Sequence, residues 1–336
     1  MKDKTILITG GAGFLGSNLA RRLLAQGANV TLCDNLSRKG SERNLEKIKK
    51  EFPQIKISTV EIADAPNIIA RARPDLVYHF AAQVAVTSSV ISPINDFKIN
   101  AEGTFRVAET AGSFGIPVIY SSTNKVYGDN VNNVPIREMD TRYDFDGELK
   151  ERGIDENFSI DAGHHTPYGC SKLAGELYVR EYGGVVNRFS CMYGRYQNGI
   201  IDQGWLSYFV IQKLLKKPIT IFGDGKQVRD AVHADDVIDL LEIQGKRLFD
   251  PQLPSIQGEV FTIGGGYKNS ISLLELCSRL EIQPRFEDWR PADQKVFYCD
   301  IGKAQRVLGW SPKVSVEKGL TDLVLWTGRE LNLEEK

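Results

Sequence analysis

The sequence predicts an α/β protein with a doubly wound parallel Rossmann sheet and a smaller C-terminal α/β lobe. Three observations support this fold class. Short apolar runs rich in β-branched residues alternate with segments long enough to form helices. Runs such as VIYSS show no polar alternation, which is typical of strands that helices cover on both faces. The first of these runs leads directly into a glycine-rich turn.

The expected strands are short and end in turn residues. They are TILIT (5–9), NVTLCD (29–34), IKISTV (55–60), DLVYHF (75–80), PVIYSS (117–122) and VVNRF (185–189). The clearest helical segments are SNLARRLLAQG (17–27) and TPYGCSKLAGELYVREY (166–182). Beyond about residue 190, GDGKQ, DPQLP and GGGYK separate shorter elements. We therefore expect a Rossmann domain over residues 1–190, to which later segments return, and a second lobe over residues 191–336.

Composition favours small-molecule chemistry. The 336 residues are 42% hydrophobic and 25% charged, which fits one large globular domain or two unequal ones. The 42 basic and 43 acidic residues give a net charge of -1, and no block of like charge suggests a nucleic-acid arm or a membrane-surface helix. No run of 18 apolar residues occurs. We expect a cytoplasmic protein that binds neither nucleic acid nor membrane.

The cysteines and histidines do not predict a disulfide framework or a metal site. The five cysteines are an odd number, lie far apart and include no CxxC pair, as expected of a chain in a reducing compartment. His164 and His165 are adjacent, but the sequence offers no further ligands at metal-binding spacing. We interpret this pair as loop residues and expect no metal.

The first chemical signal is TGGAGFLG, residues 9–16, which follows a strand and precedes a helical run. Its glycines, Gly10, Gly13 and Gly16, allow a pyrophosphate to approach the backbone at a helix N-terminus. Asp34 ends the next strand, where a carboxylate can accept both ribose hydroxyls of an adenosine. This favours NAD over NADP. Two alternatives remain: Asp34 could be a turn residue, and Arg38 could serve a 2′-phosphate.

The second signal is PYGCSK, residues 167–172, at the start of a helix. Tyr168 and Lys172 are four residues apart and therefore share one helix face. A tyrosine with its ordinary pKa near 10 is a poor base at neutral pH, but a neighbouring ammonium stabilises its phenolate. An ordinary helix pair would have the same spacing. The glycine turn and the threonine at the end of a strand, Thr123, favour the catalytic interpretation.

Taken in this order, these motifs resemble the extended short-chain dehydrogenase/reductases, the group of NAD-dependent nucleotide-sugar epimerases and dehydratases. The resemblance covers nearly the whole chain. It extends to HFAAQVAVTSS (79–89), Asn100, VRDAVHADD (228–236) and WRPADQ (289–294). Within the group, SSTNKVYGD (121–129), PYGCSK, IDQGW (201–205) and GDGKQVRD (223–230) are most similar to the CDP-paratose (CDP-tyvelose) 2-epimerases.

The resemblance implies a role for each matching residue. Thr123, Tyr168 and Lys172 would form the reacting group. The NAD site would comprise Gly10, Gly13, Phe14, Leu15, Gly16, Asp34, Asn35, Ser37, Arg38, Ile62, Ala81, Ala82, Gln83, Asn100, Ser121, Tyr168 and Lys172. The site for a nucleotide-diphosphate sugar would comprise Gln83, Thr123, Gln203, Arg229, Arg290 and Asp293. Guanidinium groups suit phosphate oxygens and a carboxylate suits ribose hydroxyls. Arg229 could instead be a structural partner of Asp230 or Asp235.

Two departures from the family pattern matter. Glu61 stands where the family usually has aspartate, which makes a side-chain hydrogen bond to adenine less secure. The 4,6-dehydratases of the group typically carry an aspartate and then a glutamate after the threonine, whereas this chain has Asn124 and Lys125. An amide and an ammonium cannot supply that acid and base, so elimination of water is disfavoured.

The resemblance therefore implies an isomerase that holds NAD and inverts one carbon of the sugar through a transient keto sugar and NADH. The assignment of the reaction to carbon 2 of a CDP-linked sugar rests on the family likeness alone, and a UDP-hexose 4-epimerase is the alternative. A 4,6-dehydratase and a non-catalytic NAD-sensing protein are further alternatives. By analogy we expect a homo-oligomer, a dimer or tetramer, paired through helices near 94–114 and 167–182. Residues 141–166 resemble a subfamily insertion, and their composition suits a surface loop.

Overall fold

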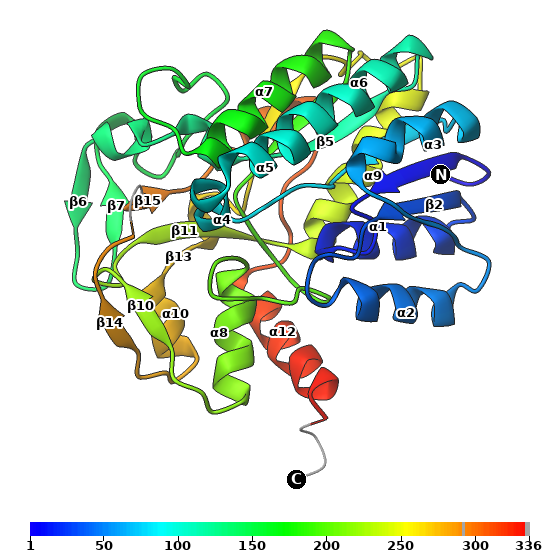
Figure 1. Cartoon of the computed structure of the whole chain (residues 1–336). Coiled ribbons are helices and arrows are strands. Elements are labelled where there is room, and N and C mark those ends of the chain that lie inside the picture. The colour runs from blue at the N-terminus through cyan, green and yellow to red at the C-terminus, as the bar shows by residue number, and fades with distance from the viewer. Residues whose placement is uncertain (291–292, 333–336) are drawn as a thin grey trace. The chain divides into compact units, whose positions relative to one another are not determined.

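The computed structural model describes residues 1–290 and 293–332, which form two compact units that interleave along the chain (Figure 1). The first unit comprises Met1–Val126, Pro167–Arg188 and Ile238–Phe261. The second comprises Tyr127–Thr166, Phe189–Val237 and Thr262–Lys336. The expected boundary near residue 190 is thus one of several crossings. Residues 127–166, which the sequence placed in the Rossmann domain, belong to the second unit, and residues 238–261 return to the first.

The first unit is built on a seven-stranded sheet with the order β12-β8-β5-β4-β1-β2-β3. The pairs β1–β2, β1–β4, β2–β3 and β4–β5 are parallel. The strands are β1 (Thr5–Thr9), β2 (Asn29–Asp34), β3 (Lys56–Thr59), β4 (Leu76–His79), β5 (Val118–Thr123), β8 (Val185–Phe189) and β12 (Val260–Ile263). The six strands expected from the sequence are all present, and β12 is an additional one.

Helices cover both faces of this sheet, as Figure 1 shows for α3, α6 and α7 on one face and α1 and α2 on the other. The helices are α1 (Phe14–Ala25), α2 (Ser41–Glu51), α3 (Ala65–Ala72), α4 (Val86–Ile91), α5 (Pro93–Phe97), α6 (Gly103–Ser113), α7 (Pro167–Glu181) and α9 (Ala234–Phe249). Single turns lie at η1 (Ile62–Asp64), η2 (Lys98–Glu102) and η3 (Asn124–Tyr127). Arg22 of α1 contacts Asp239 and Glu242 of α9 at 2.8 and 3.4 Å, which ties the late segment to the first helix.

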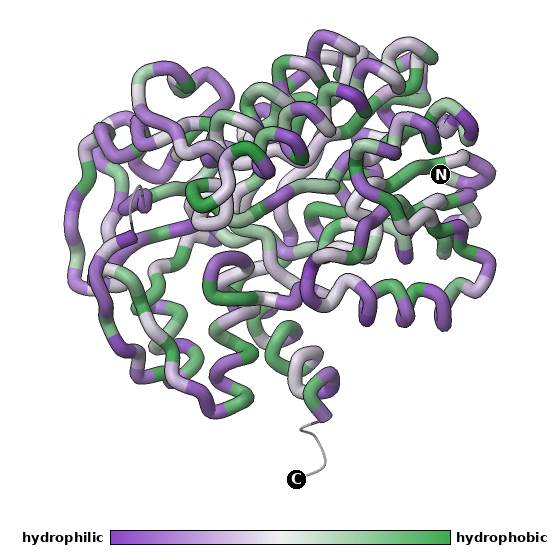
Figure 2. Tube along the Cα trace, viewed as in Figure 1, coloured by the Kyte–Doolittle hydropathy of each residue, from purple (hydrophilic) through white to green (hydrophobic). Residues whose placement is uncertain are grey.

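The sheet forms where the sequence is continuously apolar. Ile6, Leu7 and Ile8 of β1 are fully buried, as parallel strands between two helix layers must be. In Figure 2, β1 beside the N-terminus is green, whereas α2 alternates between purple and green because only one of its faces is buried. Of the described helices, none has the length and apolar content that crossing a membrane requires.

The strand order creates the position for a ligand. From β1 the chain moves outward to β2 and β3, and then crosses back to β4 on the other side of β1. The carboxyl ends of β1 and β4 therefore border a crevice where the winding direction reverses, and open α/β sheets bind ligands at such a point. The glycine turn follows β1, and the loop with Ala81 and Ala82 follows β4.

The second unit contains smaller sheets. β11 (Val228–His233) pairs in parallel with β9 (Cys191–Tyr193) and β15 (Val296–Phe297), and antiparallel with β13 (Ser270–Ser272). β10 (Thr220–Phe222) pairs with β14 (Arg285–Glu287), and β6 (Ile136–Glu138) with β7 (Tyr143–Phe145). The remaining elements are η4 (Asn130–Asn133), η5 (Gly147–Leu149), α8 (Trp205–Leu214), η6 (Tyr267–Asn269), α10 (Leu273–Arg279), α11 (Gly302–Leu308) and α12 (Val316–Glu330). Their apolar faces enclose a core around Phe209, Ile271 and Leu323.

The expectation of a surface loop over residues 141–166 holds for most of this segment but is wrong at Tyr143–Phe145 and around Ile154. Tyr143, Asp144 and Phe145 form a buried strand, and the Phe145 ring packs 4.9 Å from the ring of Tyr298. Ile154 is fully buried and forms a bridge with Cys299. The acidic composition misled the prediction because several of these acids have partners inside the second unit. One example is Asp144, which accepts a hydrogen bond of 3.0 Å from the Tyr298 hydroxyl.

Candidate cofactor and active site

Close backbone contacts shape the glycine turn between β1 and α1. Gly10 has φ +67°, and a Cβ there would lie 2.7 Å from the nitrogen of Ala81. A Cβ on Gly16 would lie 2.3 Å from the Gly10 oxygen. At Gly13, among the described residues, a Cβ would closely approach only the Gly10 oxygen, at 3.1 Å. The fold therefore requires glycine at positions 10 and 16 but barely at 13, where a missing side chain chiefly leaves space for a ligand.

The start of α1 suits an anion. Phe14 and Leu15 are its first residues, and within the described chain no side chain caps this end. The first N–H groups of a helix have no partner inside the helix and carry a partial positive charge. They can therefore donate to the oxygens of a pyrophosphate placed over Gly13.

Asp34 is held at the end of β2 by two backbone donors. Its Oδ2 accepts from the nitrogen of Ala12 at 2.9 Å, and its Oδ1 accepts from the nitrogen of Leu36 at 2.8 Å. The carboxylate is thus fixed beside the glycine turn, where it can also accept ribose hydroxyls. The bond from Leu36 forms an Asx turn, so Asp34 also serves as a turn residue.

The residues expected around the adenosine lie in the same region. Asn35 accepts hydrogen bonds from the nitrogen and hydroxyl of Ser37 at 3.1 and 2.7 Å, and its Nδ2 donates to Glu61 Oε2 at 3.0 Å. Glu61 is exposed, but its carboxylate already accepts a hydrogen bond from Asn35. Ile62 packs its side chain against Gly103 of α6, where a Cβ would come within 2.9 Å. Arg38 is half-buried, and burial lowers the pKa of its guanidinium.

The loop after β4 is anchored to β1 and to η2. The nitrogen of Ala81 donates to Thr9 Oγ1 at 3.2 Å, and Ala82 follows in the same half-buried loop. Gln83 and Asn100 exchange two hydrogen bonds, both 2.9 Å: the Gln83 nitrogen donates to Asn100 Oδ1, and Asn100 Nδ2 donates to the Gln83 oxygen. Asn100 lies in the π-helical turn Lys98–Glu102, a wide turn of the kind often found at functional sites.

Tyr168 and Thr123 meet at the end of β5. Tyr168 is the second residue of α7 and is only 8% exposed. The pKa of its phenol is raised to about 12 by all causes together. Burial is the largest cause, and the negative charge of Asp96 also raises the pKa. A hydrogen bond with the Thr123 side chain and the positive charge of Arg38 lower it. The site thus contains both a hydroxyl and a cation that favour the phenolate, and one anion that opposes it.

Lys172 lies one turn further along α7 and is 2% exposed. Its Nζ donates to the carbonyl oxygen of Ser121 at 2.6 Å and lies 4.1 Å from the centre of the Tyr120 ring. The pKa of the ammonium is lowered to about 7 by all causes together. Burial is the largest cause, and the negative charges of Glu176 and Asp96 oppose it. The ring face and the two acids support the charged form, which a buried lysine would otherwise lose.

Three charged residues beside this group were missed by the sequence reasoning. Asp96 is 1% exposed and binds Gln83, Asn100 and Ser171. Glu176 accepts from Ser122 Oγ at 2.5 Å and forms a buried ion pair of 2.8 Å with Arg188. The available signal was spacing: Asp96 lies four residues before Asn100, and Glu176 four residues after Lys172, each on one helical face.

His79 is a buried structural residue of β4. Its Nδ1 lies 2.6 Å from Thr9 Oγ1, and its Nε2 lies 2.9 Å from Thr104 Oγ1. Burial first, and then the charge of Lys172, lower its pKa to about 3. A neutral imidazole between two hydroxyls therefore joins β4 to β1 and α6 behind the cofactor crevice.

The residues expected to bind the nucleotide lie in the second unit. Arg229 Nη2 contacts Asp293 Oδ1 at 2.6 Å, so its partner is neither Asp230 nor Asp235. Asp230 instead accepts from the nitrogens of Gly266 and Cys299 at 3.0 and 3.2 Å. The structure thus pairs two residues that the sequence analysis had assigned to the same ligand.

Arg290, also in the second unit, has partners of its own. Its guanidinium carbon is 4.1 Å from the centre of the Phe222 ring, and its Nη2 is 3.4 Å from Asp202 Oδ1. Gln203 follows Asp202 and closes a tight turn by exchanging backbone hydrogen bonds of 2.9 and 3.0 Å with Ile200. Arg290 is therefore oriented by an aromatic ring and by the turn that carries Gln203.

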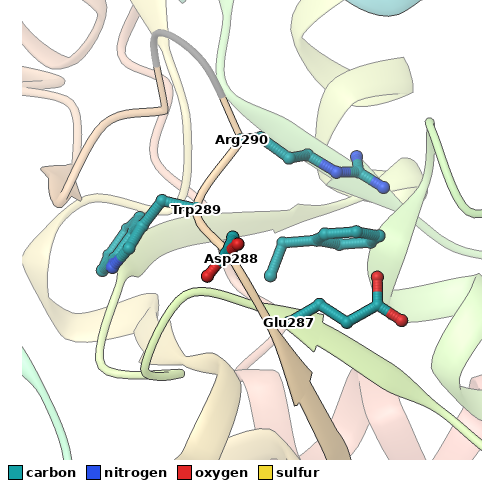
Figure 3. A pocket seen from close by; sticks show the side chains of 5 residues that line it. Glu287, Asp288, Trp289 and Arg290 are labelled. Carbon is teal, nitrogen blue, oxygen red and sulfur yellow. The ribbon is translucent and has the colours of Figure 1, made fainter.

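A shallow depression of about 500 Å³ lies beside Arg290. Figure 3 shows Trp289 and Arg290 pointing to opposite sides of the segment that continues from β14. Phe222, Glu287 and Asp288 complete the lining. The Trp289 ring packs on Gly223, where a Cβ would come within 2.7 Å. Flat aromatic and guanidinium groups here offer stacking surfaces rather than a deep cavity.

The residues of the first unit fit a dinucleotide. The glycine turn provides space over Gly13, α1 provides unpaired N–H groups, and Asp34 provides a fixed carboxylate. Tyr168, Thr123 and Lys172 lie together at the ends of β5 and α7. NAD would supply a hydride acceptor at such a site.

Comparisons with known proteins agree with this geometry. The sequence model of the "NAD dependent epimerase/dehydratase family" matches residues 6–243. A CDP-paratose 2-epimerase of Salmonella typhi is 41% identical over 96% of this chain and 98% of the relative. A UDP-glucose 4-epimerase of Thermotoga maritima, solved with UDP-glucose, superposes with a TM-score of 0.78 at 30% identity, covering 97% of this chain and 99% of the other.

A UDP-glucuronic acid 4-epimerase of Bacillus cereus, solved with UDP-glucuronic acid and NAD, also has a TM-score of 0.78, at 27% identity over 97% of this chain and 99% of the other. Three kinds of comparison, by family, sequence and structure, thus agree over nearly the whole chain. The chain belongs to the NAD dependent epimerase/dehydratase family, as an isomerase whose cofactor is NAD.

Proposed function

We propose that the protein is a nucleotide-sugar epimerase that inverts carbon 2 of a CDP-linked hexose, of the CDP-paratose/CDP-tyvelose type. The observation that carries the proposal is the meeting of the Tyr168 phenol with the Thr123 hydroxyl at the end of β5, with Lys172 one turn away. These groups suit reversible oxidation of a sugar hydroxyl. The choice of CDP and carbon 2 rests on the likeness to the Salmonella enzyme.

The chemistry of the protein groups follows from their positions. NAD, when bound, takes a hydride from a sugar carbon and returns it to the opposite face of that carbon. Tyr168 removes the proton of the hydroxyl on the same carbon and gives it back in the return step, while Thr123 aligns the oxygen. Lys172 and Arg38 supply positive charge that stabilises the phenolate. No net redox change occurs, since the keto sugar formed in the first step is reduced in the second.

The residues after Thr123 disfavour a dehydratase. Asn124 is buried, and its Oδ1 lies 3.3 Å from Thr123 Oγ1. An amide in this place cannot donate the proton that expels water, and Lys125 cannot act as the carboxylate base. Epimerisation needs neither group, because one tyrosine serves both directions of proton transfer.

The nucleotide would be anchored by the second unit. Arg229 and Arg290 would bind diphosphate oxygens, and Asp293 would bind ribose hydroxyls. The turn that carries Gln203 would hold Arg290 toward the phosphate. Gln83 uses its side chain on Ala85 and Asp96 and its backbone nitrogen on Asn100, so we propose a substrate or cofactor contact through the second lone pair of its backbone oxygen. A UDP-hexose 4-epimerase is the second candidate, supported by the Thermotoga structure.

A product assay tests the function. The protein is incubated separately with CDP-, UDP- and GDP-hexoses, and the sugars released by hydrolysis are resolved to identify the inverted carbon. We expect inversion at carbon 2 of a CDP sugar. Tyr168→Phe should reduce kcat by about 100-fold or more, because the proton acceptor is lost.

Three results would count against this function. Activity retained by Tyr168→Phe would remove tyrosine from its role. Full activity of protein stripped of NAD, with none added back, would exclude the hydride route altogether. Inversion at carbon 4 of a UDP sugar would favour the second candidate.

A further inference from the structure

We propose that Asp96 is a positioning residue: an ionised, buried carboxylate that fixes the active face of α7 and sets the pH range in which Tyr168 exchanges a proton with substrate. The proposal rests on the proposed function only for its consequence in catalysis. Its basis is a hydrogen-bond network within the first unit that joins α5, η2, α7 and the loop after β4 around one side chain.

Two amides donate to one oxygen of Asp96. Gln83 Nε2 and Asn100 Nδ2 each lie 3.0 Å from Asp96 Oδ1. Backbone groups fix both amides in this orientation. Gln83 Nε2 also donates to the Ala85 oxygen at 2.8 Å while its Oε1 accepts from the Ala85 nitrogen, and Asn100 is paired with the Gln83 backbone. Neither amide can turn an acceptor toward Asp96 without losing these bonds.

The other oxygen of Asp96 binds the catalytic helix. Ser171 Oγ donates to Asp96 Oδ2 at 2.5 Å and lies 3.1 Å from the carbonyl oxygen of Tyr168. Ser171 precedes Lys172, so this contact fixes the turn of α7 between the phenol and the ammonium. Three donors converge on Asp96. An ionised carboxylate can accept all three hydrogen bonds, because it has only acceptor sites.

The charge of Asp96 acts on both catalytic groups. Burial raises the pKa of Asp96 above its ordinary value, although its three donors and the positive charge of Lys172 oppose that shift. The three donors suit the ionised form, which has only acceptor sites. This anion raises the pKa of Tyr168 and also that of Lys172. Asp96 therefore raises the pH at which Tyr168 loses its proton, and it helps to keep the buried Lys172 protonated.

Other charged groups face the same site and must be counted. Arg38, after β2, opposes Asp96 at Tyr168. Glu176 on α7 adds to Asp96 at Lys172 and is itself paired with Arg188 on β8. Tyr120 on β5 and His79 on β4 are buried, with their pKa values shifted so that both stay neutral. Asp96 is the anion among these that acts on Tyr168 and Lys172 together.

Asp96→Asn separates charge from geometry. The asparagine oxygen can accept from Gln83 and Asn100, its Nδ2 can donate to Ser171 Oγ, and the Ser171 hydroxyl can then donate to the Tyr168 carbonyl. Every hydrogen bond thus finds a partner, so we expect the variant to fold and to bind NAD as the parent protein does. Ser171→Ala is the matched control, because it removes one hydrogen bond and keeps the charge.

The test measures the ionisation of Tyr168 directly. Phenolate absorbance of the NAD-loaded protein is titrated over the pH range in which circular dichroism shows an intact fold, and Tyr168→Phe provides the blank for the other tyrosines. We expect the Tyr168 midpoint of Asp96→Asn to move toward acid by about one pH unit, because an anion that opposed the phenolate is gone. Ser171→Ala should titrate as the parent does.

The pH profile of kcat provides a second readout. Its two limbs report the proton equilibria of Tyr168 and Lys172. Removing an anion lowers both pKa values, so both limbs of Asp96→Asn should move toward acid. A purely structural role would lower the rate without moving the limbs. An unshifted phenolate titration in Asp96→Asn would overturn the inference, whereas a failure of the proposed function would appear separately as missing epimeric product.

Discussion

The Tyr168 phenol is the group whose surroundings most clearly oppose its task. Burial raises its pKa to about 12, yet proton abstraction near neutral pH requires the phenolate. The Thr123 hydroxyl and the Arg38 guanidinium both favour that phenolate, whereas Asp96 disfavours it. Lys172 sits close by with its own pKa lowered to about 7. The pKa of Tyr168 is therefore set by several neighbouring groups with opposing effects rather than by one activating residue.

Substitution of Thr123 tests this balance at the residue scale. Thr123→Val removes the hydrogen bond that favours the phenolate while keeping the shape of the side chain. The pKa of Tyr168 should then rise, so that the limb of the kcat profile that reports Tyr168 moves to higher pH, opposite to Asp96→Asn. We expect kcat at neutral pH to fall by about 100-fold.

Thr123→Ser is the control, because it keeps the hydroxyl and should remain within a few-fold of the parent rate. The two variants are compared by steady-state kinetics across pH with the sugar that gives product. A normal rate and an unmoved pH profile of kcat in Thr123→Val would show that the hydroxyl does not act on Tyr168.

At this scale the sequence predicts residues that belong to short motifs and fails for residues that act across the fold. Thr123, Tyr168 and Lys172 were predicted as a group, and the structure brings them together. Asp96 could not be identified, because its three donors come from positions 83, 100 and 171. The four-residue spacing from Asp96 to Asn100 indicates one of these contacts, but not the convergence of all three.

At the scale of elements, the glycine turn contains one glycine that the packing of the fold requires, Gly16, and one that leaves space for the ligand, Gly13. Gly16 lies against the Gly10 oxygen, so Gly16→Ala should disrupt the packing of α1 on β1 and lower the thermal midpoint of unfolding. Gly13→Ala needs a shift of only a few tenths of an ångström within the chain. We expect Gly13→Ala to keep its thermal midpoint without NAD but to bind NAD at least about tenfold more weakly.

Calorimetry of NAD binding and thermal unfolding of the NAD-free proteins measure the two effects. The outcome that contradicts this interpretation is an unchanged NAD affinity in Gly13→Ala. A large loss of stability in that variant would instead mean that Gly13 serves the fold.

The elements themselves were predictable where the chain is regular. Six strands of the Rossmann sheet follow from continuous apolar runs, because a strand buried on both faces needs no alternation. β7 was missed because Tyr143–Phe145 is short and lies between acidic residues whose partners are distant in sequence. β12 was missed for a related reason, since Val260–Ile263 pairs only after α9 has carried the chain back to the first unit.

At the scale of the whole molecule, the interleaving of the units limits what sequence can predict. Each unit is assembled from three segments, and neither is complete until segments that the other unit separates along the chain come together. Periodicity reports local structure, whereas membership of a unit depends on which buried faces match. This explains why a boundary at residue 190 located one crossing and assigned residues 127–166 to the other unit.

The surface of the first unit leads to the last prediction, a homo-oligomer formed through its helices. Ile91 of α4, Ile94 and Phe97 of α5 and Leu177 of α7 are 85%, 67%, 55% and 57% exposed, and α4 and α5 pack against α7. Clustered exposed apolar side chains of this kind mark interaction surfaces. Covering them with the same helices of a second copy would bury apolar area on both chains at once.

Leu177→Glu should therefore lower the mass measured by light scattering to that of one chain of 37.5 kDa, because a carboxylate would have to be buried in the contact. Leu325→Glu is the matched control, since Leu325 is 52% exposed on α12 of the second unit. This control should leave the mass of the parent unchanged. A parent protein that is already monomeric, or an equal effect of both substitutions, would rule out pairing through α4, α5 and α7, and these apolar side chains would then need another explanation.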